Sequence, residues 1–331
     1  MANKNITITD VAEALGVSKT TVSRAISGKG RIGEETKQRV LAYIEENNYT
    51  PNVIAKSLAQ SKTYNIGVVM PGNYALMDLP FFQEALLGIQ EIAGISEYDI
   101  LLSISHEDDI SSLERIVANR KVDGVILLRT FEEDQQIPLL KEKGIPFVAT
   151  GSSSYQGVVQ VDHDHESACR ELTSVLLMKN KRIALLGGNR KIVVNKRRLR
   201  GYRDAFAAAG REVDESLVFL DLENRTDINR AVEEALERNA DCILAMDDGI
   251  CAQVIRKLRH AHMSIPNDIK VASFYNSILL ENNTPAITSV AFDAKELGIM
   301  ACKNLLSQID EEEVPSKMLL SYEVVLKEST K

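Results

Sequence analysis

The chain has 331 residues and a net charge of −8, so it is long enough for two or three domains and is not a general polyanion binder. The charge is unevenly distributed, because residues 1–62 carry nine Lys and Arg against six Asp and Glu, a net +3, which leaves −11 for the remainder. A basic N-terminal module joined to an acidic body indicates that only the first part of the chain meets an anionic partner.

Targeting and redox features predict a cytoplasmic protein. The N-terminus lacks the apolar core of a signal peptide, and no apolar run approaches the length of a membrane span, so we expect no membrane partner. The four cysteines lie far apart and form no CxxC pair, which argues against a disulfide framework or a zinc ribbon. We therefore expect buried free thiols in a reducing compartment.

Three short helices are predicted between residues 6 and 50. The first begins at Thr7, which can cap it together with Asp10. The second follows the helix-breaking Gly16 and begins at Ser18, a favourable N-cap, and the third runs over about 34–46. Two helices joined by a tight glycine turn and braced by a third have the geometry of a helix-turn-helix.

In that geometry the second helix enters the major groove of DNA by its N-terminal end. Lys19 and Thr20 would then face base edges, with Arg24 one turn further on, because such side chains pair with base acceptors or contact a methyl group. Nearby hydroxyl groups are better suited to phosphate oxygens; they belong to Ser18, Thr21 and Ser23. On spacing alone, an ordinary solvated helix face explains the pattern about equally well.

Residues 48–64 are predicted to form a linker. Pro51 can occupy the first turn of a short helix, and residues 52–59 are mildly amphipathic. The segment has too little apolar surface to fold alone, so we expect it to become helical only when it lies against something else.

From Tyr64 onward, short apolar runs alternate with helical patterns. Continuous apolar strands joined by helical crossovers predict parallel sheets covered on both faces. The length of this region predicts two lobes, with residues 158–167 as a plausible crossing between them. The predicted strands are residues 66–70, 100–104, 124–128, 147–150, 183–187, 242–246 and 271–274.

Two sequence blocks are specific when taken together: "TITDVAEALGVSKTTVSRAISG" and "YTPNVIAKSLAQSKTYNIGVVMP". They resemble the LacI/GalR family of bacterial repressors almost position by position. The likeness continues through "VDGVILL", "RLRGYRDAF" and "SIPNDIKVASF", so it covers essentially the whole chain.

The resemblance implies an α/β protein with a three-helix helix-turn-helix head, a hinge helix, and a two-lobed periplasmic-binding-protein-like core of doubly wound parallel sheets. It places the DNA-binding head at residues 1–50, the hinge helix and linker at 51–63, and the effector-binding and dimerisation core at 64–331. Within the core it implies an N-lobe of about 64–163 and 292–319, and a C-lobe of about 164–291 and 320–331.

The family also implies a homodimer in which each head reads half of a roughly palindromic double-stranded operator. A pair of hinge helices would push a leucine into the minor groove and kink the duplex, and Leu58 matches that leucine. Asn52 matches an asparagine that contacts the DNA backbone, and Thr7 joins the hydroxyl residues expected there. Gly33 stands where the third helix usually has a serine cap, which removes one phosphate contact.

A small-molecule effector, commonly a sugar, is implied between the lobes. Arg198 in "RLRGY" matches the effector-binding arginine of the family, and a guanidinium can pair with vicinal hydroxyls or a carboxylate. Asp247 matches a polar ligand contact, and Phe82 lies where an apolar wall is expected. Taken alone, Phe82 is better explained as a core residue.

Three departures from the family pattern weaken the case for a simple monosaccharide. Tyr275 replaces a carboxylate that many members use on sugar hydroxyls, so it joins the expected effector residues. Gly151 stands where several members have an aspartate, and Leu222 where an aromatic residue often stacks on the ligand. "LLGGNRKIVVNKRRLRGY" combined with "SFYN" is closer to the maltose and α-glucoside regulators of Gram-positive bacteria.

We therefore expect a repressor of carbohydrate-utilisation genes that a sugar controls allosterically. The alternatives are a regulator with a non-sugar effector, such as a purine, and a pure ligand-binding protein. No enzyme, catalytic set or cofactor is expected, since "LLGGNRK" is neither a dinucleotide fingerprint nor a Walker loop. His163 and His165 suggest a metal ligand pair, but no third ligand is evident and we expect no metal site.

Overall fold

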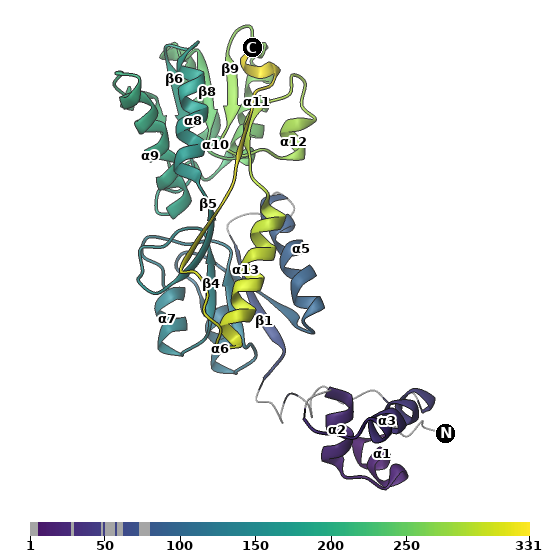
Figure 1. The fold of residues 1–331 in the computed structure, drawn as a ribbon. Coiled ribbons are helices and arrows are strands. Elements are labelled where there is room, and N and C mark those ends of the chain that lie inside the picture. The colour runs from purple at the N-terminus through teal and green to yellow at the C-terminus, as the bar shows by residue number, and fades with distance from the viewer. Residues whose placement is uncertain (1–5, 28–29, 48, 50–56, 58–61, 73–79) are drawn as a thin grey trace. The chain divides into compact units, whose positions relative to one another are not determined.

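The computed structural model describes residues 6–27, 30–47, 49, 57, 62–72 and 80–331. The chain divides into two compact units, Met1–Thr63 and Tyr64–Lys331 (Figure 1). Within the described ranges, no helix combines the length and the apolar character needed to cross a lipid bilayer.

The first unit consists of three helices around a small apolar core. They are α1 (Ile8–Leu15), α2 (Lys19–Ser27) and α3 (Glu34–Glu46). Each helix buries one apolar stripe, because residues three or four positions apart share a helix face. The buried side chains of this core are Val11, Ala12, Val22, Ala25, Val40 and Tyr49.

A tight turn joins α1 to α2. Gly16 ends α1 with a φ of 66°, in the left-handed region that favours glycine, and its N–H donates to the carbonyls of Ala12 and Glu13. Arg39 of α3 donates from Nη2 to the Leu15 carbonyl at 3.4 Å. The third helix thus holds the end of the first, and the predicted helix-turn-helix is confirmed.

The second unit contains two six-stranded sheets within residues 62–72 and 80–331. The first sheet has the order β11-β5-β4-β3-β1-β2, and all of its pairs are parallel. Its strands are β1 (Asn65–Pro71), β2 (Asp99–Ser105), β3 (Gly124–Leu127), β4 (Phe147–Thr150), β5 (Val159–His163) and β11 (Lys317–Leu320). Its helices are α5 (Pro80–Ile95), α6 (Ser111–Ala118), α7 (Gln136–Glu142) and α13 (Ala294–Ile309). We call this sheet with its helices the N-lobe.

The second sheet has the order β12-β10-β9-β8-β6-β7, and only the pair of β12 with β10 is antiparallel among its described strands. Its strands are β6 (Ile183–Leu186), β7 (Val218–Phe219), β8 (Cys242–Ala245), β9 (Lys270–Ser273), β10 (Thr288–Ala291) and β12 (Glu323–Val325). Its helices are α8 (His165–Leu177), α9 (Val193–Ala208), α10 (Arg225–Glu237), α11 (Asp248–His260) and α12 (Ile278–Glu281), with the short 3-10 turns η2 (Glu215–Leu217) and η3 (Glu328–Thr330). We call this sheet with its helices the C-lobe.

Helices cover both faces of each sheet, because alternate strand residues point to opposite sides. In the N-lobe, Val68 packs towards α5 and α13, whereas Val69 packs towards α6 and α7. In the C-lobe, Leu185 faces α8 and α9, and Leu186 faces α10 and α11. The predicted α/β fold with doubly wound parallel sheets is confirmed, and all four cysteines are buried as free thiols.

The chain passes between the lobes three times, after β5, after β10 and after β11. The stretch 158–167 therefore contains a whole strand as well as a crossing, which takes place at Asp164, the N-cap of α8. As a result, α13 and β11 from the C-terminal part of the chain complete the N-lobe (Figure 1).

Glycines set the distance between two pairs of helices. A Cβ built on Gly88 of α5 would lie 2.1 Å from the Lys295 carbonyl oxygen, and one built on Gly298 of α13 would lie 2.0 Å from the Ala85 carbonyl oxygen. In the C-lobe, a Cβ on Gly201 of α9 would lie 2.3 Å from a carbonyl oxygen of α8. No larger residue fits these positions without moving a backbone.

Candidate functional site

The second helix of the head presents a polar face. Lys19, Thr20 and Arg24 are exposed, whereas Val22 and Ala25 on the other face are buried. Ser23 is also exposed on this helix. A three-turn helix whose apolar side is used by the core leaves these side chains available to a partner.

Two of the predicted DNA-backbone residues cap helices. The Thr7 hydroxyl accepts from the Asp10 N–H at 3.4 Å, and the Thr7 N–H donates to the Asp10 carboxylate at 2.8 Å, so the predicted capping box is present. Ser18 Oγ accepts from the Thr21 N–H at 3.1 Å and lies 2.8 Å from the Thr21 hydroxyl. These bonds fix the N-terminal ends of α1 and α2.

Of the other residues considered at the DNA-facing surface, some are described by the structure and others are not. The side chain of Arg24 lies against Gly30, where an added Cβ would be 3.2 Å from its Cδ. Gly33, at the N-cap of α3, makes no side-chain hydrogen bond to that helix. Asn52 and Leu58 lie outside the described residues.

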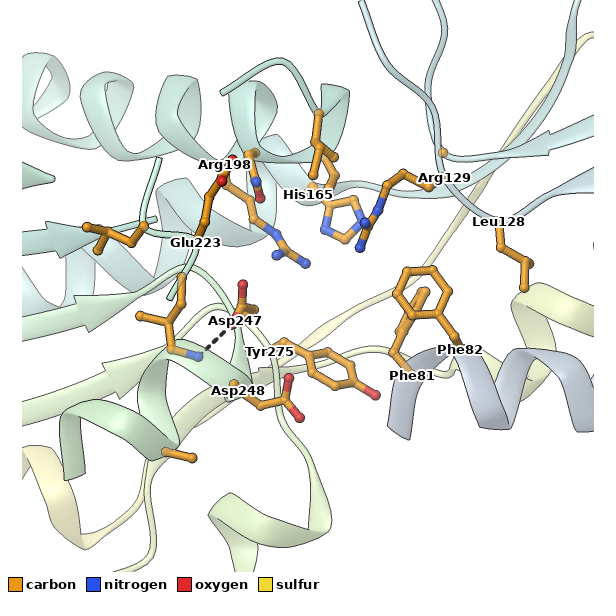
Figure 2. A pocket seen from close by; sticks show the side chains of 18 of the residues that line it. Phe81, Phe82, Leu128, Arg129, His165, Arg198, Glu223, Asp247, Asp248 and Tyr275 are labelled. Atoms are coloured by element: carbon orange, nitrogen blue, oxygen red, sulfur yellow. Dashed lines mark hydrogen bonds between the residues drawn. The ribbon is translucent and has the colours of Figure 1, made fainter. Parts of the chain in front are cut away.

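A cavity of about 430 Å³ lies between the N-lobe and the C-lobe (Figure 2). Its walls include residues that follow the carboxyl ends of strands in both sheets, such as Arg129 after β3 and Asp247 after β8. Ligands of open parallel sheets bind at this end of the strands. The four predicted effector residues all line this cavity: Phe82, Arg198, Asp247 and Tyr275.

Arg198 projects from α9 and is buried. Its Nη1 donates to the Met246 carbonyl at 2.6 Å, which holds the guanidinium beside the end of β8. Its Nε has no hydrogen-bond partner among the described residues. The rest of the guanidinium lines the cavity, where it can donate to a ligand acceptor.

Two adjacent carboxylates stand at the start of α11. Asp247 is its N-cap, and its Oδ1 accepts from the Ile250 N–H at 2.8 Å. Burial, aided by the charge of Asp247, raises the pKa of Asp248 to about 6. Asp247 is thus held in one orientation, while Asp248 is easier to protonate than an ordinary aspartate.

Aromatic side chains from both lobes form one wall. Phe81 of α5 packs edge-on against Tyr275, with ring centroids 5.4 Å apart, and against Phe82 at 5.3 Å. The guanidinium carbon of Arg129 lies 5.3 Å from the centroid of the Phe82 ring. Phe82 therefore lines the cavity in addition to packing against its neighbours.

The residues that replace the family's usual carboxylate and aromatic stacking residue can also be located. Gly151, with a φ of 110°, and Leu222 both line the cavity. Neither offers a polar side chain or an aromatic face to a ligand. This agrees with the departures seen in the sequence.

Several residues of the cavity were not predicted from the sequence to bind a ligand: Phe81, Arg129, His165 and Asp248. Arg129 and Asp248 closely follow buried strands. Because ligands bind at the carboxyl ends of parallel strands, their position after an apolar run could have identified them as site residues. His165 begins α8, and its Nε2 lies 3.4 Å from Asp162 Oδ1, while Asp162 Oδ2 accepts from the Ser152 hydroxyl at 2.8 Å. Throughout the part of the chain that the structure describes, no group of three or more His, Cys, Asp and Glu is arranged to hold a metal ion.

The lobes also meet through contacts outside the aromatic wall. Glu107 of the N-lobe accepts from Lys191 at 2.6 Å and from Asn189 at 3.0 Å, both in the C-lobe. These hydrogen bonds lower the pKa of Glu107, and the bond from Lys191 has the larger effect. Phe131 and Ile192 form a β-bridge across the same junction. Relative motion of the lobes would have to break these contacts.

Acid should destabilise the core through His163, whose ring packs 4.9 Å from that of Phe292. Burial, together with His165, lowers the pKa of His163 from 6.5 to about 4, against the opposing charges of Asp162 and Asp293. The folded chain keeps the ring neutral while the unfolded chain takes up a proton, so stability is lost as pH falls from about 6.5 to about 4, by up to about 3 kcal/mol.

We expect His163→Phe to reduce this loss, measured as the free energy of unfolding in urea between pH 7 and pH 4. His260→Phe, at an exposed position at the end of α11, serves as the control. An unchanged pH slope in His163→Phe would contradict the assignment.

Comparison with known proteins extends the likeness over the whole chain. Residues 7–52 match the family model of bacterial regulatory proteins of the lacI family, and residues 179–330 match the periplasmic binding protein-like domain. The HTH-type transcriptional regulator MalR of Streptococcus pneumoniae serotype 4 is 30% identical over 333 residues, which span 97% of this chain and 99% of that one.

Catabolite control protein A of Staphylococcus xylosus is 29% identical, over 98% of this chain and 99% of its own. The solved structure of a complex of the transcriptional regulator CelR with cellobiose has 29% identity and a TM-score of 0.73, over 98% of this chain and 99% of that chain. Similarity to regulators over the full length, with a helix-turn-helix unit and a two-lobed unit that encloses a cavity, shows that the chain belongs to the LacI family of bacterial transcription regulators rather than to a family of enzymes.

Proposed function

We propose that this LacI-family regulator represses carbohydrate-utilisation genes and is controlled by a sugar bound between its lobes. The observation that carries the proposal is the cavity, in which residues from both lobes combine an aromatic wall with a buried arginine and fixed carboxylates. Aromatic faces and planar polar groups are suited to a sugar ring and its hydroxyls. The similar CelR structure contains cellobiose. Bacterial operators lie in the cytoplasm, so we place the protein there.

A mobility-shift assay on a palindromic site upstream of the protein's own gene tests this function. We expect a sequence-specific complex whose affinity changes on addition of maltose or cellobiose. If no specific complex forms, with or without sugars, the proposal that the protein regulates this operator is wrong. A response to purines and to no sugar would show that the effector is not a sugar.

The proposed DNA contacts divide into base-reading and backbone-binding groups. Lys19, Thr20 and Arg24 read base edges, supported by their exposure on α2. Asn52 contacts the backbone and Leu58 enters the minor groove, on the strength of the family resemblance. The hydroxyl residues proposed for phosphate contacts are Thr7, Ser18, Thr21 and Ser23.

Lys19→Ala and Leu58→Ala should therefore weaken operator binding in different ways. Loss of Lys19 should relax base preference at one position of each half-site and cost about 1–3 kcal/mol there. Loss of Leu58 should weaken binding to every operator sequence that shares the central base-pair step, because the kink at that step is lost. Affinity measured across an operator library distinguishes the two patterns. Glu45→Ala, exposed on α3, is the control; the same uniform loss in both variants would show that the roles are wrong.

A homodimer is proposed because apolar side chains are exposed on neighbouring parts of the N-lobe. Leu102 and Ile104 lie two residues apart on the edge strand β2 and are 52% and 46% exposed. Exposed edge strands with apolar side chains are typical of surfaces that associate. We expect Leu102→Lys with Ile104→Lys to give monomers in sedimentation analysis and to lower operator affinity. Met178→Lys, at a residue 84% exposed on the C-lobe, should leave the dimer intact.

Control of DNA binding would follow from relative movement of the lobes. The chain crosses between them three times, so a ligand that contacts both lobes changes the angle of the N-lobe relative to the C-lobe. In a dimer this would alter the separation of the two N-lobes and thereby the pairing of the hinge segments that follow each head. The two sites would be coupled in this way.

A further inference from the structure

Residues 189–196 of the C-lobe reach the N-lobe and contact two of its loops. We call this segment, which follows β6 and runs into the first turn of α9, the strap. Its backbone pairs with the loop after β3. The Glu132 N–H donates to the Lys191 carbonyl at 3.0 Å, and the Val193 N–H donates to the Thr130 carbonyl at 3.2 Å. The strap therefore forms a short backbone ladder between the lobes.

Charged side chains reinforce this backbone pairing. Lys191 donates to Glu107, in the loop after β2, at 2.6 Å, and Lys196 forms an ion pair with Glu132, in the loop after β3. The hydrogen bond to Glu107 raises the pKa of Lys191, and two more N-lobe carboxylates add to this effect: Asp108 and Glu133. A cationic strap thus meets an acidic surface of the N-lobe.

The strap lies far from the points where the chain crosses between the lobes. In the N-lobe sheet, the chain leaves for the C-lobe after β5 and after β11, the two strands at one edge, whereas the strap meets the loops after β3 and β2. β5 and β2 are separated by four strand spacings, or about 19 Å. In the C-lobe sheet, β10 and β12 lie at one edge, and β6, which leads into the strap, lies next to the other.

The cavity extends between the crossings and the strap. His165, directly after the first crossing, lines it, and so do Ile192 of the strap and Thr130, which the strap contacts. Rotation of the lobes about the crossings would therefore separate the strap from the N-lobe. The four charged side chains of the two interlobe pairs lie outside the wall of the cavity. Their contacts form between protein groups, whichever ligand the cavity holds.

We propose that the strap is an ionic latch, which holds the lobes together opposite the crossings and opens more often as ionic strength rises. Salt screens exposed ion pairs, and the side chains of Lys191 and Lys196 are 67% and 53% exposed. Opening of the latch would be a required step in the lobe movement that is proposed to control DNA binding. Only this consequence rests on the proposed function, because the latch itself depends on no ligand.

Hydrogen exchange of the full chain, without added ligand, measures opening of the latch at two amides. The Glu132 N–H belongs to the N-lobe and the Val193 N–H to the C-lobe, and each donates across the junction. We expect Lys191→Met with Lys196→Met to speed exchange of both amides by at least about threefold, a factor that two exposed ion pairs together can supply. In the unaltered chain, about 1 M sodium chloride should act in the same way, because the screening length is then about 3 Å. The same salt should change exchange in the double variant little.

Arg190→Met is the matched control, because Arg190 lies on the strap but pairs with Asp221 of its own lobe at 2.7 Å. Exchange of both amides should stay within about twofold of the unaltered chain. Faster exchange at one amide alone would indicate fraying of a single loop and would overturn the latch. A change below about threefold in the double variant, or an equal change in Arg190→Met, would overturn it as well. The proposed sugar effector would stand in each of these cases, since binding of a sugar is tested separately by the mobility shift.

Discussion

Gly298→Val should lower the free energy of unfolding by about 3 kcal/mol or more. A Cβ at this position would lie 2.0 Å from the Ala85 carbonyl oxygen and 3.1 Å from the Ala85 Cα, so α13 cannot keep its distance from α5. Overpacking against side chains costs about 1–3 kcal/mol, and here the obstacle is a backbone, which has fewer ways to move. Gly88 of α5 lies equally close to the backbone of α13, so α5 has no room to accommodate a larger residue on α13.

Urea unfolding followed by circular dichroism at the helix band measures this effect, together with a fall in melting temperature of at least about 5 °C. Gly94→Ala is the matched control, since it lies on α5 and its Cβ would meet only Gln90, at 3.9 Å. Alanine there should stabilise the helix by up to about 1 kcal/mol. A loss below about 1 kcal/mol in Gly298→Val would show that the two helices do not approach as closely as described.

Arg198→Met should reduce affinity for the effector sugar by about 100-fold while leaving operator binding unchanged. In the proposed site the substitution removes the hydrogen bonds of the guanidinium to the sugar, and hydrogen bonds from charged groups contribute about 1.5–3 kcal/mol each. The bond to the Met246 carbonyl, which positions the guanidinium, is lost as well. Arg198→Lys keeps the charge but not the planar fork, so we expect it to recover only a small part of the affinity.

The control for Arg198 lies on the same helix. Arg200 has a side chain 59% exposed and faces Glu166 at 3.5 Å, so Arg200→Met should leave sugar affinity within about twofold of the unaltered chain, as expected for a surface ion pair. Titration calorimetry gives the affinity, and the mobility shift gives the response of the operator complex. If Arg198→Met and Arg200→Met bind sugar equally well, the guanidinium of Arg198 has no part in the site.

Local features of the chain were predictable because they depend on neighbours in sequence. The capping box of Thr7 and Asp10 and the left-handed turn at Gly16 need only a few adjacent residues. The apolar runs that became β1, β3 and β8 needed only their own hydropathy, because strands buried on both faces are apolar throughout. Short strands with mixed side chains carried no such signal. The strands β5, β7, β10, β11 and β12 were therefore not predicted.

The cavity depended on contacts between distant segments. Of the predicted effector residues, Arg198 and Asp247 came from matched family motifs, not from spacing or burial. That Arg129 and Arg198 line one cavity could not be predicted, since they belong to different lobes and come to the same cavity only when both sheets have formed. The roles of these side chains in ligand and DNA binding stay predictions.

The sequence by itself determined the type of each unit: a basic helical head and an acidic body of alternating strands and helices, both recognisable from local patterns. Only the tertiary structure decided which lobe each late segment joins. Lys317 of β11 pairs with Gln160 of β5, a partner far away along the chain, and no local periodicity encodes that choice. The same holds for the cavity, because a site shared by two lobes exists only after each has closed its own core and the three crossings have set them face to face.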